Sequence, residues 1–165
     1  MKRGLAGLCL MLGIACLPQS AWSSCLLTLC TCSVSATPVS FGVYDPFSSS
    51  PSDTSGTITV SCTGLVVSVL VSYDILLNKG IHASSFLPRQ MASGVNTLDY
   101  NLYTDSTRTT VWGDGTGGTS IVTDGYLLGL FTVNRDYTVY GRIPASQTGV
   151  HTGDYSDTIT VTVNY

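Results

Sequence analysis

The chain has 165 residues, of which 44% are hydrophobic and only 10% are charged, and its formal net charge is −3. This length fits one domain. All ten acidic residues are aspartates, whereas helix-rich chains use Glu and Lys heavily, so a helical bundle or a coiled coil is excluded. The hydrophobic content argues against a disordered chain, and the negative charge argues against a nucleic-acid partner.

The N-terminal residues have the features of a secretory signal peptide. Lys2 and Arg3 precede an apolar run at residues 5–17. Ala21 and Ser23 are small residues at the −3 and −1 positions of a cleavage site. The apolar run is too short to be a membrane span.

We therefore expect residues 1–23 to be a signal peptide and residues 24–165 to form one exported domain without a membrane span. An alternative stays open, in which Cys16 is the lipidated residue of a lipoprotein signal. Gly13 stands where such signals usually carry Leu, which favours the first interpretation.

The cysteines that follow the signal peptide are expected to form disulfides, because exported proteins fold in an oxidising compartment. These cysteines are Cys25, Cys30, Cys32 and Cys62. A bond between Cys30 and Cys32 would close a very tight ring. Of the other two schemes, alternation favours Cys32–Cys62 with Cys25–Cys30, because Cys32 shares a face with Val34, and Cys62 shares one with Val60. The spacing does not match a metal site, so we expect no metal and no cofactor.

Apolar and polar residues alternate along most of the exported chain, which is typical of half-buried strands. The alternating segments are residues 32–36, 58–62, 67–77, 98–102, 126–133, 137–143 and 155–165. Turn residues cluster at 48–56, 113–118 and 134–136, and residues 84–95 read as a loop or a helical turn. Short strands with turns between them predict an all-β fold, an antiparallel β-sandwich.

The last segment alternates most regularly and runs to the terminal carboxylate. Its apolar face is formed by Tyr155, Ile159, Val161, Val163 and Tyr165. If this strand lies inside a sandwich, its neighbour on one side is missing from the chain, and its edge can accept a strand from another molecule. The alternative, a last strand already paired on both sides, is equally open at this point.

Motifs for catalysis are absent. The chain has no Gly-x-Ser-x-Gly elbow, no His-Glu-x-x-His motif and no phosphate loop with a lysine. The aspartates, Asp114 among them, stand in turn sequences, where carboxylates usually bind nearby backbone. Trp112 and the tyrosines can in principle stack on sugars, but aromatic residues in strands mostly belong to the core. We expect no enzymatic activity.

Several segments of the exported chain, taken in order, resemble the spore coat protein U-type domain family. They are residues 32–42, 44–46 (Tyr-Asp-Pro), 56–62, 89–91, 100–105, 108–115, 140–145 and 153–161. This family is shared by coat proteins and by subunits of archaic chaperone–usher pili of Gram-negative bacteria. The resemblance covers nearly the whole exported chain.

The resemblance implies an incomplete immunoglobulin-like sandwich. In such subunits a periplasmic chaperone holds the open sandwich, an outer-membrane usher assembles it, and the N-terminal strand of a neighbouring subunit completes it. The implied groove for that strand is lined here by Tyr155, Ile159, Val161, Val163 and Tyr165. The family's disulfide carries over onto Cys32 and Cys62.

Two functions are compatible with these features of the sequence. The first is a non-catalytic, secreted structural or adhesion subunit of a pilus or coat, which passes through the periplasm to the cell surface. Only residues 24–31 precede Cys32, a short arm for donation, so a tip or minor subunit fits better than a main rod subunit. The alternative is a free-standing secreted module that binds a glycan or a surface through the loops at 47–53 and 113–118.

Overall fold

The structure, a computed structural model, describes residues 29–65 and 67–165, and these contain eight strands. The strands are β1 (Cys30–Ala36), β2 (Ser52–Gly64), β3 (Val69–Leu77), β4 (Arg89–Ser93), β5 (Asn96–Tyr103), β6 (Val122–Leu128), β7 (Thr132–Ile143) and β8 (Val161–Asn164). The predicted signal peptide lies outside the described residues. No helix in the described part of the chain is long and apolar enough to cross a membrane.

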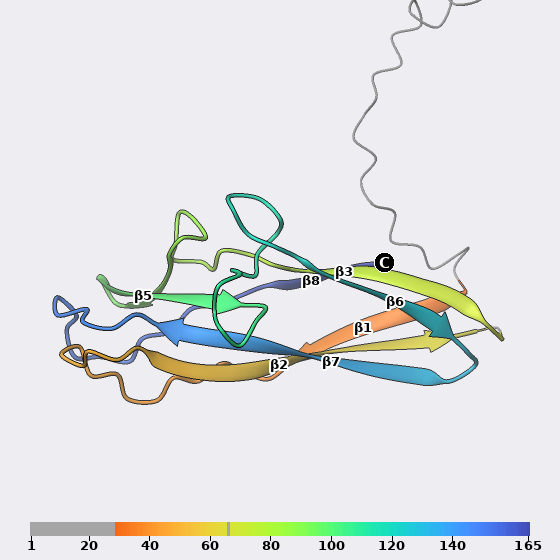
Figure 1. Ribbon diagram of the computed structural model, residues 1–165, viewed down its shortest axis with the longest axis horizontal. Coiled ribbons are helices and arrows are strands. Elements are labelled where there is room, and N and C mark those ends of the chain that lie inside the picture. The colour runs from red at the N-terminus through yellow and green to blue at the C-terminus, as the bar shows by residue number, and fades with distance from the viewer. Residues whose placement is uncertain (1–28, 66) are drawn as a thin grey trace, which may run out of the picture.

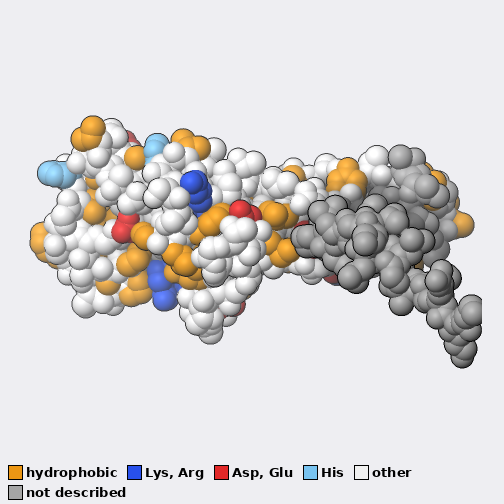
Figure 2. All heavy atoms as spheres, turned by 90° about the horizontal axis from the view of Figure 1, so that it is seen from above, with side chains coloured by type: hydrophobic (Ala, Val, Ile, Leu, Met, Phe, Trp, Pro, Cys, Tyr) orange, Lys and Arg blue, Asp and Glu red, His pale blue; other side chains and the backbone are white. Residues whose placement is uncertain are grey.

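Two antiparallel sheets face each other (Figure 1). One has the strand order β1-β2-β7-β5-β4, and the other has the order β6-β3-β8. Their facing side chains, among them Val60 and Tyr73, form a core to which Trp112 from the segment between β5 and β6 also belongs. The predicted all-β, immunoglobulin-like sandwich is therefore confirmed. Charged side chains are sparse on the face of the sandwich shown in Figure 2, in keeping with the composition.

The first sheet is built on a long pairing between β2 and β7, which extends from Ser52 to Thr63. Residues 52–56, which the sequence assigns to a turn cluster, belong to β2. Strand β1 lies on the other side of β2, with Cys32 directly opposite Cys62. These two cysteines form the predicted disulfide, with an S–S distance of 2.04 Å.

The second sheet is centred on β3, whose inward residues are almost completely buried, as the alternation predicts. The strand begins at Val69, not at Val67 as predicted. Ser68 has a φ of 69°, which is incompatible with an extended strand, and the side chain of Val67 is 75% exposed. The first residue of the predicted strand therefore lies in the β2–β3 turn.

The turn predicted at residues 134–136 is wrong. These residues lie inside β7, and the β6–β7 turn is formed by residues 129–131. Asp136 is held on the strand because the hydroxyl of Thr59 donates to its carboxylate (2.6 Å). The guanidinium of Arg135 lies 4.8 Å from the ring centre of Tyr126. Exposed polar side chains on a strand thus resembled a turn in the sequence.

The loop predicted at residues 84–95 is also corrected, because β4 and the start of its hairpin with β5 lie there. The first residue of β4, Arg89, is fully buried. The guanidinium donates to the carbonyl oxygens of Asn78 (2.8 and 3.1 Å) and Trp112 (2.6 Å) and to the side-chain oxygen of Asn101 (2.7 Å). Burial lowers the pKa of Arg89 to about 10, so the group stays charged at neutral pH.

The substitution Arg89→Met tests this buried connection. It keeps much of the side-chain volume, but it removes the Arg89 donors from the carbonyl oxygens of Asn78 and Trp112 and leaves the Asn101 side-chain oxygen with only the N–H of Leu102. We therefore expect the free energy of unfolding to fall by about 3 kcal/mol. Urea denaturation of the mature chain at low protein concentration measures the change. Arg135→Met is the control, because the side chain of Arg135 is exposed and its guanidinium lies over the ring of Tyr126, not against buried acceptors. An equal loss in both variants would contradict the role of Arg89.

Candidate functional site

Strand β8 has a neighbour on one side only. Val161–Asn164 pair with residues 74–77 of β3, and within the described residues nothing pairs with the opposite edge. Of the two sequence interpretations, the structure therefore supports the strand that lacks a neighbour. An edge of this kind presents backbone N–H and C=O groups to an incoming strand.

The inward face of the last segment is only half covered. Tyr155, Ile159, Val161 and Val163 are partly buried and alternate with exposed residues, as predicted. In contrast, the inward residues of the central strand β3 are almost completely buried. The last segment thus presents a regular apolar face that the rest of the chain leaves partly open.

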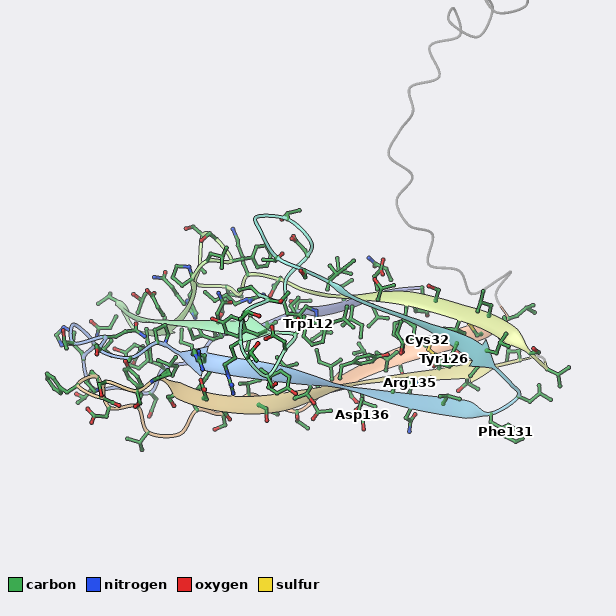
Figure 3. All side chains as sticks on the ribbon, viewed as in Figure 1. Cys32, Trp112, Tyr126, Phe131, Arg135 and Asp136 are labelled. Carbon is green, nitrogen blue, oxygen red and sulfur yellow. A yellow bond between two sulfur atoms is a disulfide. The ribbon has the colours of Figure 1, made fainter. Side chains whose placement is uncertain are left out.

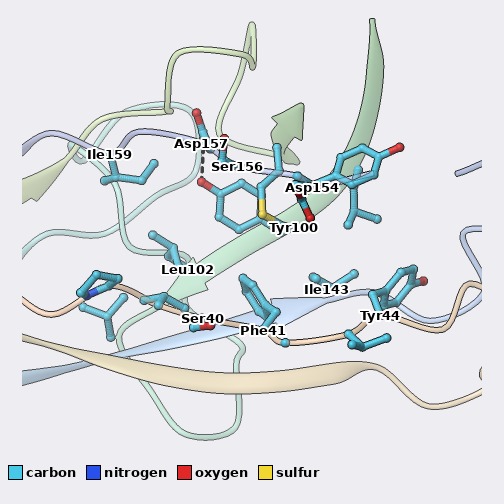
Figure 4. Close-up of a pocket in the computed structure, with 18 of the residues that line it drawn as sticks. Ser40, Phe41, Tyr44, Tyr100, Leu102, Ile143, Asp154, Ser156, Asp157 and Ile159 are labelled. Carbon is cyan, nitrogen blue, oxygen red and sulfur yellow. Dashed lines mark hydrogen bonds between the residues drawn. The ribbon is translucent and has the colours of Figure 1, made fainter. Parts of the chain in front are cut away.

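An open groove of about 900 Å³ lies beneath this face. Its floor is apolar and comes from both sheets. The floor residues are Ile58, Leu77, Met91, Leu98, Tyr100, Leu102, Val139 and Ile143. One wall is the segment 150–161, and the other is the segment 36–44, which follows β1. Figure 4 shows Ile159 and Asp157 on one side, Phe41 and Tyr44 on the other, and Tyr100 between them.

Two glycines create the wall formed by residues 36–44. The ladder between β1 and β2 ends at the bond from Thr37 N to Thr57 O (2.8 Å), and the chain then crosses the inner face of the sheet. A Cβ atom on Gly56 would lie 2.9 Å from Val39, and one on Gly141 would lie 2.7 Å from the same side chain. Any larger residue in β2 or β7 at these points would therefore displace the wall.

Three of the five predicted groove residues line the groove, and two do not. Tyr155, Ile159 and Val161 line the groove. Val163 packs against the core beyond the groove lining, and Tyr165 is 40% exposed. The hydroxyl of Tyr165 donates to the carbonyl of Cys32 (3.4 Å), so the end of the chain meets β1. The use of this groove by another strand stays a prediction.

Other candidate positions have structural roles. Trp112 is 1% exposed and donates its indole N–H to the carbonyl of Ile75 (3.0 Å), so it belongs to the core. Asp114 accepts the backbone N–H of Thr116 (2.9 Å), a turn contact. No three His, Cys or Asp residues of the described chain are placed to hold a metal ion. Cys25 lies outside the described residues, so its pairing with Cys30 stays a prediction.

Comparisons with known proteins identify the family. The family model of the Spore Coat Protein U domain matches residues 21–162. The chain belongs to the spore coat protein U domain family. Protein U of Myxococcus xanthus is similar to it, with 34% identity over 139 residues, which are 77% of this chain and 71% of that protein.

A solved structure shows the same fold. It is the CsuC–CsuE chaperone–tip adhesion subunit pre-assembly complex from archaic chaperone–usher Csu pili of Acinetobacter baumannii. The TM-score is 0.53 at 22% sequence identity, and the match covers 83% of this chain. This chain spans only 40% of the matched chain in that complex.

In this spore coat protein U domain, Asp157 fixes the start of the open edge. Its carboxylate accepts the hydroxyl of Tyr100 (2.7 Å) and the backbone N–H of Ile81 (2.9 Å). A Cβ atom on Gly80 would lie 1.9 Å from that carboxylate, so only glycine allows the approach. Sequence reasoning missed Asp157 because it stands in a polar, turn-like stretch. Its place among the alternating inward residues was the available signal.

Substitutions of this contact test its contribution to stability. Asp157→Ala leaves the Tyr100 hydroxyl and the N–H groups of Ile81 and Thr158 without this acceptor, and we expect a loss of about 1–3 kcal/mol in the free energy of unfolding. Tyr100→Phe removes one of these three bonds and should cost less. The double variant should lose less than the sum of both, because the two side chains share one bond. Strict additivity in urea denaturation would show that the two residues act separately.

The buried tyrosines predict alkaline sensitivity. Burial, followed by the hydrogen bond to Asp157, raises the pKa of Tyr100, and burial with the bond to Asp124 raises the pKa of Tyr137. Burial also raises the pKa of Tyr126 to about 12.

Because these groups stay neutral in the folded state, their stabilisation is present below the unfolded pKa of about 10 and is lost as the pH rises above it. We expect the free energy of unfolding to fall above about pH 10, and less steeply in Tyr137→Phe. Phenolate absorbance and urea denaturation measure both effects. An unchanged slope in Tyr137→Phe would contradict the assignment.

Proposed function

We propose that the protein is a non-catalytic structural subunit of a chaperone–usher type pilus or a related coat. In this proposal the groove along β8 receives an extended strand from a neighbouring chain. The observation that carries it is the unpaired edge of β8 above an apolar groove of about 900 Å³. The absence of catalytic motifs from the sequence fits a structural role.

The chemistry of the groove suits a β-strand. Backbone groups along the open edge of β8 supply hydrogen bonds over the length of a strand, and apolar floor residues such as Leu98 and Val139 accept alternate side chains. A helix cannot use the backbone groups of a sheet edge, because its own backbone groups are already paired. A small ligand would leave most of the edge unpaired.

Family and fold support the proposed partners. The similar structure from Acinetobacter baumannii is a complex of a chaperone with a tip adhesion subunit. For this chain we propose a periplasmic chaperone, an outer-membrane usher and neighbouring subunits as partners. The signal peptide at residues 1–23 would direct the chain to the periplasm, and assembly would then place it on the cell surface of a Gram-negative bacterium.

The short segment before Cys32 favours a tip or minor position in the assembly. Cleavage after Ser23 leaves residues 24–31, which is a short arm to fill the groove of a neighbour. A subunit that receives a strand but donates poorly fits the end of a fibre.

The substitution Val161→Asp tests the groove. Val161 lines the groove, and a carboxylate there would face the apolar floor without a partner. The loss of about 1.5–3 kcal/mol of apolar burial corresponds to at least about tenfold weaker binding. We expect a matching fall in the periplasmic yield of the soluble complex when the variant is co-expressed with a pilus chaperone from the source organism.

The matched control is Thr162→Asp, one residue further along β8, where the side chain is exposed on the outer face. It should retain the yield of the unsubstituted chain. If both variants behave alike, the groove is not the binding surface. If a donor peptide neither binds nor stabilises the unsubstituted mature chain, the assembly proposal fails and the free-standing binding module takes its place.

A further inference from the structure

One end of the sandwich exposes a group of large apolar side chains, here called the apolar end. Its members are Leu65, Val67, Leu70, Leu127, Leu130 and Phe131. Their exposed fractions range from 54% for Leu130 to 79% for Phe131. Single exposed apolar residues are normal on a protein surface, but six together indicate a surface that another segment or molecule covers.

These residues come from two turns that touch and from the strand ends next to them. A Cβ atom on Gly64, at the β2–β3 turn, would lie 2.2 Å from the carbonyl oxygen of Gly129, at the β6–β7 turn. Leu70 and Leu127 are opposite each other in the ladder between β3 and β6. Figure 3 shows Phe131 at the far end of the molecule. Residues 64–70 and 127–133 contain no charged residue, so the apolar end has no charges of its own.

The N-terminal part of the described chain enters at this same end. The backbone N–H of Leu65 donates to the carbonyl of Leu29 (2.8 Å), and Cys30 pairs with Gly64 at the start of β1. Cys30 itself is 4% exposed. Whatever precedes Leu29 therefore begins beside the apolar end, not beside the groove residues at the other end of β2.

The length and sequence of the preceding segment match this surface. Cleavage after Ser23 leaves residues 24–28, which span at most roughly 17 Å when fully extended. This segment carries two adjacent leucines, Leu26 and Leu27. A disulfide between Cys25 and Cys30 would hold the two Cα atoms within about 7 Å, which returns the segment to the place where the chain enters.

We propose that residues 24–28 fold back onto the apolar end, with Leu26 and Leu27 covering the exposed side chains of the two turns. The predicted Cys25–Cys30 disulfide is the tether. The proposal rests on the predicted cleavage site and on this pair, and it does not depend on what fills the groove. A segment held in this way is a cap for its own domain and is not available to a neighbour.

Photo-crosslinking on the full mature chain tests the proposal. Phe131→p-benzoylphenylalanine places the probe on the apolar end of the exported protein, and mass spectrometry establishes the N-terminus, the disulfides and the crosslinked residues. We expect a crosslink to residues 24–28 of the same chain, in a product of monomer mass. The control is the same probe at Val95, which is 97% exposed in the β4–β5 turn and should give no such crosslink.

Each other outcome has a defined meaning. Crosslinks between two chains would show that a second copy covers the apolar end, and the absence of any crosslink to residues 24–28 would show that the end is open; either result overturns the proposal. Cys25→Ser should abolish the crosslink from position 131 if the disulfide is the tether. A crosslink of unchanged yield in this variant would overturn that role. None of these results bears on the Val161→Asp experiment, so the two proposals fail separately.

Discussion

Among the described strands β8 pairs with β3 alone, and its open edge lies beside the apolar floor of the groove. In the centre of this sheet, β3 buries its inward residues almost completely. Along β8 the same alternation leaves Ile159 and Val161 only half-buried. A ligand that binds only the folded state stabilises it by an amount that rises with the logarithm of its concentration relative to its dissociation constant. If a strand fills the groove as proposed, the stability of this domain depends on that strand as well as on the chain itself.

Local sequence patterns predicted most of the strands because period-two alternation directly reflects one buried and one exposed face. The same logic favoured the bond between Cys32 and Cys62, which the structure contains. It failed where polar residues cover a strand, as Asp136 does on β7, and where a charged residue starts one, as Arg89 does. The burial of Arg89 depends on oxygen atoms from three distant segments, and no local pattern reports them.

The groove also combines residues that the sequence pattern predicted with residues that it did not. Alternation predicted the apolar face that carries Tyr155, Ile159 and Val161, and these residues line one wall of the groove, while their use by another strand stays a prediction. The opposite wall exists because Gly56 and Gly141 let the chain cross the inner face of the sheet. Those two glycines are far apart in the sequence and lie on neighbouring strands, so only the folded structure shows that they form one surface. Asp157 escaped notice for a related reason, because its partners come from other elements.

The disulfide between Cys32 and Cys62 joins β1 to β2, which are neighbours in the same sheet. This bond therefore adds no covalent link from one sheet to the other, and within the described chain side-chain packing and hydrogen bonds hold the two layers of the sandwich against each other. The bond therefore places no covalent restraint across the groove. In the proposed assembly, a strand would enter the groove without reduction of this disulfide.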